Sequence, residues 1–120
     1  MADRVLFISW GTPVRGAEER GLEVFNESLG MFGRMQQDGR IEGFDVMMFE
    51  PNGTMAGCIQ LHGSAEQIAS VRESEEFRRT MTQASLIVDE LSMTGGYAGD
   101  GVARQMAIYQ EAITAIPQRA

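Results

Sequence analysis

The predicted order of strands and helices limits the folds open to this chain more than any other feature of the sequence. Apolar runs separated by turn residues predict this order: strand 4–10, helix 17–38, strand 41–50, strand 55–61, two helices between 64 and 88, and strand 91–97. The order β-α-β-β-α-β is a split-crossover unit, which forms one antiparallel four-stranded sheet with its helices on one face. We therefore predict a single α+β domain over residues 1–120, with an extra helix at 102–116.

Local signals mark the ends of several elements. The turn Pro51–Gly53 separates two strands, which we expect to pair as a hairpin. Ser64 with Gln67 three residues later is a capping box that begins a helix, and Ser74 is a second N-cap. In the first helix, apolar residues recur at spacings of three and four and predict the face that packs on the sheet: Leu22, Phe25, Leu29 and Phe32.

The strands are apolar on both faces, although helices can cover only one. The expected strand order is 4-1-3-2, and the third strand places Ile59 and Leu61 on one face and the small or polar residues Cys58, Gln60 and His62 on the other. An apolar face left in solvent would be an unusually large patch for a monomer. We therefore predict a homodimer in which two sheets face each other across a cavity.

The chain resembles the dimeric α/β-barrel superfamily, whose subunits have a ferredoxin-like fold. The resemblance depends on the element order, the strand Val5–Ile8 and the run Ser74–Arg79 at the start of a main helix, and it covers about residues 4–97. It implies a dimeric α/β barrel. Proteins of this superfamily include monooxygenases, isomerases and haem-handling proteins, so the fold alone assigns no reaction.

The C-terminal helix is an addition to this common core. Asp100 is placed as its N-cap, and its apolar stripe consists of Val102, Met106, Tyr109 and Ile113. A completed four-stranded sheet has no place left for it. We expect the stripe to pack on another helix or at the dimer edge and to bury Tyr109.

Composition and charge exclude several classes of partner. The net charge of −7 disfavours binding to nucleic acid or to anionic lipid, and all ten basic residues are arginine. No leader peptide or membrane span is predicted. Cys58, the one cysteine, can form no internal disulfide and is expected to be a buried thiol. These features favour a cytoplasmic protein.

His62 and Asp45 are the candidate catalytic residues. His62, the one histidine, could act as a general base in the cavity, or it could be a structural residue bonded to the backbone. Asp45, in the middle of a strand, could bind a polar substrate group. Alternatively, it pairs with an arginine such as Arg4, or faces solvent on an edge strand. We expect no metal site and no cofactor, because one histidine cannot form a multi-histidine zinc site.

Four residues are candidates for ligand binding. Ser9 and Gln60 are polar residues of the central strands, and Trp10 and Tyr97 end two strands where they could line the mouth of a cavity. The two aromatic residues could equally close the core.

Three functions remain open at this point. The first is a homodimeric protein that binds a small apolar or aromatic molecule between its sheets. The second is a cofactor-independent monooxygenase or isomerase acting on an aromatic or polyketide-like substrate, with His62 as base. The third is a structural or protein-interaction module with no pocket.

Overall fold

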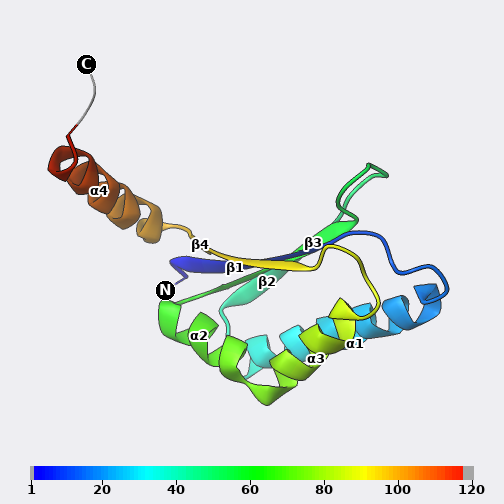
Figure 1. The fold of residues 1–120 in the computed structure, drawn as a ribbon. Helices are drawn as coiled ribbons and strands as arrows, with labels where there is room; N and C mark the ends of the chain where they lie inside the picture. The colour runs from blue at the N-terminus through cyan, green and yellow to red at the C-terminus, as the bar shows by residue number, and fades with distance from the viewer. Residues whose placement is uncertain (1, 118–120) are drawn as a thin grey trace.

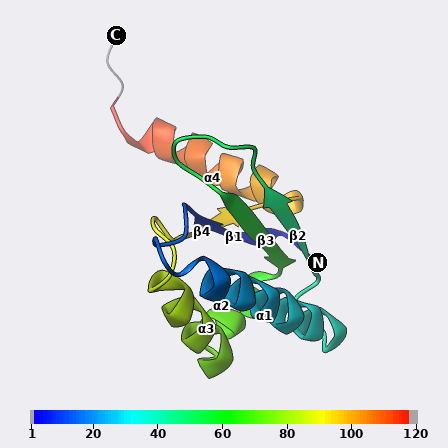
Figure 2. The ribbon, with the colours of Figure 1, turned by 90° about the vertical axis from the view of Figure 1, so that its right-hand side faces the viewer.

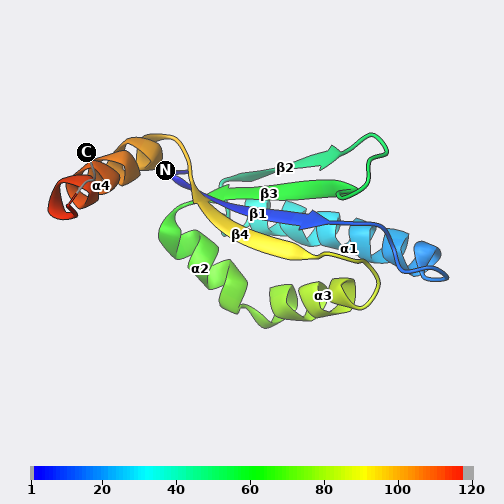
Figure 3. The same cartoon turned by 45° about the horizontal axis from the view of Figure 1, so that its top comes forward.

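The computed structural model describes residues 2–117 and has the predicted order of elements, shown in Figure 1. The elements are β1 (Arg4–Trp10), α1 (Glu18–Gln37), β2 (Gly43–Met48), β3 (Gly57–Gly63), α2 (Ala65–Glu73), α3 (Glu75–Ser85), β4 (Ser92–Tyr97) and α4 (Asp100–Ala115). The sheet order is β2-β3-β1-β4 with every pair antiparallel, and α1, α2 and α3 cover one face (Figures 1 and 3). The predicted α+β class and strand order are confirmed.

The loop between β2 and β3 is longer than the predicted turn and spans residues 49–56. The Asn52 side chain organises it. Its Nδ2 donates to the carbonyl oxygens of Glu50 (2.9 Å) and Met55 (2.7 Å), while its Oδ1 accepts from the backbone N–H of Thr54 (2.9 Å). Relative to the prediction, β2 ends two residues early, at Met48, and β3 begins two residues late, at Gly57, and runs on to Gly63.

The core lies between the sheet and the three helices. Leu6, Ile8, Ile59 and Leu61 point from β1 and β3 toward the helices and are almost fully buried. On α1, the Phe32 ring lies 5.9 Å from the ring of Phe44 and 6.3 Å from that of Phe77, centroid to centroid. These aromatic contacts join α1 to β2 and α3.

The buried face of α1 differs from the predicted stripe. Its buried residues are Val24, Ser28, Met31, Phe32 and Met35. Leu22 lies about 120° around the helix from Ser28, at roughly 100° per residue, and is 63% exposed. The centre of the face is the serine, whose hydroxyl donates to the Val24 carbonyl oxygen at 2.8 Å and so needs no other partner. The pattern of apolar residues alone therefore predicted a packing face that is rotated around the helix axis from the observed one.

Both predicted caps, at the starts of α2 and α3, are confirmed. Ser64 and Gln67 form the full capping box, and the Ser74 Oγ accepts from the backbone N–H of Phe77 at 3.3 Å. The cap predicted for α4 is wrong: Gly99, with φ of 52°, is the N-cap, and Asp100 is the first helical residue. The left-handed φ at this position suits a glycine better than an aspartate.

Helix α4 extends from the sheet at the end of β4, and Figures 1 and 2 both place it on the side away from α1, α2 and α3. Its start is fixed by an Arg104–Asp3 ion pair and by Gly101, where a Cβ would collide with the Asp3 carbonyl oxygen. Among residues 2–117 it packs on the strand β4 and not on α1, α2 or α3, and Tyr109 is 57% exposed. The predicted packing of α4 on another helix is therefore wrong, and the burial of Tyr109 at a dimer edge stays a prediction.

Candidate functional site

The face of the sheet opposite α1, α2 and α3 carries no helix packed on it. Strand alternation identifies the residues of this face. Leu6 and Ile8 point to the core, so the residues that alternate with them on β1, and the register partners of those residues on the other strands, point away from the helices. We call this surface the open face: Val5, Phe7, Ser9, Asp45, Met47, Cys58, Gln60, His62, Ser92 and Thr94. It contains four of the six residues predicted for the site, namely Ser9, Asp45, Gln60 and His62.

His62 and Asp45 form a hydrogen-bonded pair on the open face. The His62 Nε2 lies 2.7 Å from the Asp45 Oδ2, across the β2–β3 ladder. The side chain of Asp45 is 77% exposed and that of His62 is 29% exposed. Thus Asp45 pairs with the histidine and not with Arg4, the partner considered from the sequence.

The pairing decides which imidazole nitrogen could take a proton. When Nε2 donates its hydrogen to the carboxylate, Nδ1 carries the lone pair of the neutral ring. Among residues 2–117, Asp45 is the one hydrogen-bond partner of the His62 imidazole ring. The arrangement is that of a base with an orienting carboxylate, in which a proton taken by Nδ1 leaves an imidazolium stabilised by Asp45.

A row of residues that begins at Asp45 crosses all four strands of the sheet. Asp45, Gln60, Phe7 and Thr94 lie in register on four adjacent strands. Gln60 and Phe7 are half-buried, whereas Thr94 on the edge strand is exposed. A polar group of a bound molecule could therefore hydrogen-bond to Gln60 while its apolar part contacts Phe7.

Trp10 and Tyr97 do not belong to this site as the structure places them. Both alternate with open-face residues and lie on the side of the helices. Trp10 packs against Phe25, with ring centroids 5.8 Å apart, and Tyr97 lies under the Arg4 guanidinium group. They cannot contact a molecule that is bound beside His62.

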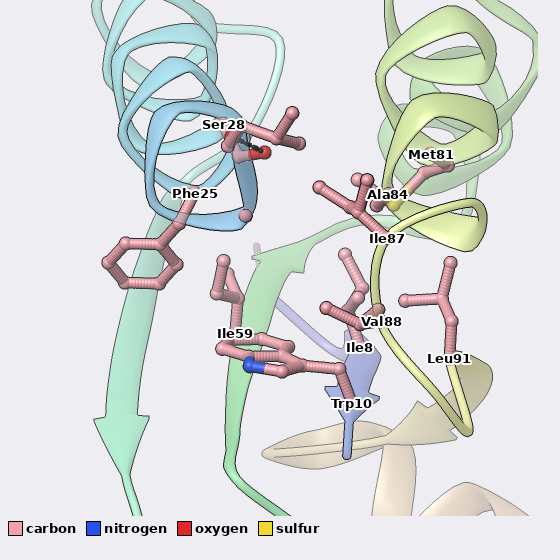
Figure 4. Close-up of a pocket in the computed structure, with 12 residues that line it drawn as sticks. Ile8, Trp10, Phe25, Ser28, Ile59, Met81, Ala84, Ile87, Val88 and Leu91 are labelled. Atoms are coloured by element: carbon pink, nitrogen blue, oxygen red, sulfur yellow. Dashed lines mark hydrogen bonds between the residues drawn. The ribbon is translucent and has the colours of Figure 1, made fainter. Parts of the chain in front are cut away.

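Trp10 instead lines a small apolar pocket between α1, α3 and the sheet, shown in Figure 4. Ser28 is its polar residue, and its hydroxyl is already bonded. The pocket volume is about 60 Å³. A cavity that admits benzene needs roughly 150 Å³, so this one is too small for an aromatic substrate.

Cys58 lies on the open face but is only 2% exposed. Desolvation by burial raises the pKa of its thiol, which lowers the fraction of reactive thiolate. We expect iodoacetamide at pH 8 to label the native protein at least about tenfold more slowly than the protein in guanidinium chloride. Equal rates, followed by mass spectrometry, would show that the thiol is accessible.

No three His, Cys, Asp or Glu residues among positions 2–117 come together as a group that could hold a metal ion. Over the same residues, none of the helices combines the length and the hydropathy required to cross a bilayer.

Three solved structures have similar folds at low sequence identity. A dimeric protein of unknown function with a ferredoxin-like fold from Bacteroides fragilis NCTC 9343 aligns with a TM-score of 0.60 and 11% identity, over 79% of this chain and 96% of its own. The chain has this ferredoxin-like fold. No protein-family model and no curated protein sequence matches it.

Two other solved structures share the ferredoxin-like fold and carry functional names. A putative antibiotic biosynthesis monooxygenase from Chloroflexus aurantiacus J-10-fl has a TM-score of 0.55 and 7% identity, over 80% of this chain and 93% of its own. SnoaB, a cofactor-independent oxygenase from Streptomyces nogalater, has a TM-score of 0.51 and 16% identity, over 82% and 93%. The predicted ferredoxin-like fold is thus confirmed.

Proposed function

We propose that the protein is a homodimer whose two open faces enclose a site for a small apolar or aromatic molecule. The observation that carries this proposal is the composition of the open face. Val5, Phe7 and Met47 are apolar, and the His62–Asp45 pair lies among them. None of α1, α2 and α3 packs over this surface. The dimeric state of the Bacteroides fragilis protein with the same fold supports the proposal.

A charge on the open face tests the dimer. We expect light scattering on the wild-type protein to give twice the chain mass of 13.2 kDa. Thr94→Arg places a charge on an exposed open-face position, so it should give a monomer at micromolar concentration. The matched control is Ser70→Arg on the exposed surface of α2. A monomeric wild type, or a control that dissociates as readily, would contradict the proposal.

The His62–Asp45 pair favours a second candidate, a cofactor-independent oxygenase or isomerase. Both reactions can begin with removal of a proton from an acidic C–H group of an aromatic ketone or polyketide-like substrate. His62 would take the proton at Nδ1, Asp45 would hold the imidazolium, and Gln60 would hydrogen-bond to the carbonyl oxygen. The two oxygenase structures with this fold support the candidate.

Deuterium exchange into β-tetralone, a bicyclic aromatic ketone, tests the shared proton-transfer step without requiring the later chemistry. In D2O, followed by proton NMR, the wild type should accelerate exchange and His62→Gln should lower that acceleration about 10²-fold. Asp45→Asn should lower it less, because Nδ1 remains. Asp38→Asn, which removes an exposed charge at the end of α1, is the control. Unchanged exchange by His62→Gln would exclude the histidine as base.

A further inference from the structure

A second hollow lies on the opposite, helix-covered side of the sheet. It is a cleft of about 330 Å³ between the β1–β4 edge and α2. Arg4 and Tyr97 line it from the strands, and Arg72 lines it from the α2 face that also carries Ile68 and Ala69. We call it the arginine cleft.

Neither arginine of the cleft has a carboxylate partner among residues 2–117. Five other arginines do, among them Arg34, which pairs with Glu76 at 2.8 Å, and Arg104, which pairs with Asp3. Arg15 and Arg78 also lack a carboxylate partner among these residues, but neither lines the cleft. Acidic residues outnumber basic ones by seventeen to ten, so partners are not scarce. The Nε of Arg4 is buried with no hydrogen-bond partner in the described chain. Burying part of a guanidinium group without an anion is costly, which points to an anion from outside the chain.

Tyr97 orients the Arg4 side chain. The guanidinium carbon lies 4.7 Å from the centroid of the Tyr97 ring. Such cation–π contacts use only the face of the planar guanidinium group. Its N–H donors lie in the plane, so the stacked group still presents an edge to which an oxyanion can bind in a bidentate manner.

Gly95 keeps the cleft open on the β4 side. It pairs in register with Leu6 and so faces the helices, yet a Cβ built there would meet no atom within 4 Å. The space beside this strand is therefore unfilled. The residues that line it include no aspartate or glutamate.

We propose that the arginine cleft binds a small molecule carrying a carboxylate or phosphate group, held between the Arg4 and Arg72 guanidinium groups. The shared chemistry is an oxyanion that accepts paired N–H donors. The net charge of −7 repels anions in general, so saturable binding cannot come from diffuse attraction. Val5 of the open face lines the edge of this cleft, but His62, Asp45 and Gln60 do not, so the inference does not depend on the proposed function.

Isothermal titration calorimetry with inorganic phosphate and, separately, with acetate tests the site at constant ionic strength. We expect saturable binding of at least one ion, and the ion that binds more tightly identifies the group. Arg72→Gln should weaken that binding about tenfold or more through the loss of charge-assisted bonds. Arg15→Gln removes the same charge from an exposed loop position and should change nothing.

A second measurement reports on Arg4 without a substitution in the sheet. The NMR signal of its Nε–H should shift on addition of the ion that binds, and the shift should saturate with the calorimetric affinity. Gly95→Val, which fills the cleft, should weaken binding like Arg72→Gln while circular dichroism shows a folded protein. The absence of saturable binding of either ion, or equal losses in Arg72→Gln and Arg15→Gln, would overturn the proposal.

Discussion

Truncating Phe32 to alanine should lower the free energy of unfolding by about 3–5 kcal/mol. Phe32 is fully buried on α1, and its ring contacts those of Phe44 and Phe77. The substitution removes the apolar group that joins α1, β2 and α3 and leaves a cavity that the packed sheet cannot close. Because small domains are stable by about 5–15 kcal/mol in total, urea denaturation should show a large drop in the midpoint.

Leu22→Ala on the same helix is the matched control. At 63% exposed, Leu22 contributes little to the core, and its truncation should change stability by less than about 0.5 kcal/mol. Similar losses for the two variants would mean that α1 packs with the stripe predicted from the sequence. They would then contradict the packing face centred on Ser28.

The fold could be predicted because several independent signals agree. Turn residues and apolar runs set the element order, and the split-crossover rule then fixed the strand order β2-β3-β1-β4. The capping box at Ser64 and the cap at Ser74 are local, so they needed no tertiary information. The packing face of α1 was missed because Ser28 satisfies its hydroxyl within the helix, which a count of apolar residues cannot register.

From the sequence, strand alternation could predict which face of the sheet a site residue lies on, but not which residues pair there. Alternation placed Gln60 and His62 on one face, but the Asp45–His62 pair depends on the β2–β3 register. The loop that joins these two strands is organised by Asn52, and its length was not evident from the turn residues. Trp10 shares parity with the buried Ile8, so alternation could have excluded it from the open face.

Removing residues 102–120 should weaken the proposed dimer and leave the subunit folded. Val102, Met106 and Tyr109 of α4 are 48%, 49% and 57% exposed, and the helix lies on the open-face side of the sheet (Figure 2). A partner packed on the open face would meet this stripe, and burying one such side chain is worth about 1.5–3 kcal/mol. The dimer should therefore dissociate about a hundredfold or more readily.

The truncated chain keeps every buried apolar residue of the core, since all of them precede Gly101. Its circular dichroism should retain the signals of the sheet and of α1–α3, while its melting temperature should lose the dependence on protein concentration that a dimer shows. Arg104→Gln, which breaks only the ion pair to Asp3, should keep that dependence. If the truncated protein dimerises as tightly as the full chain, α4 takes no part in the interface. If it unfolds, the contacts of α4 with β4 and Asp3 stabilise the subunit itself.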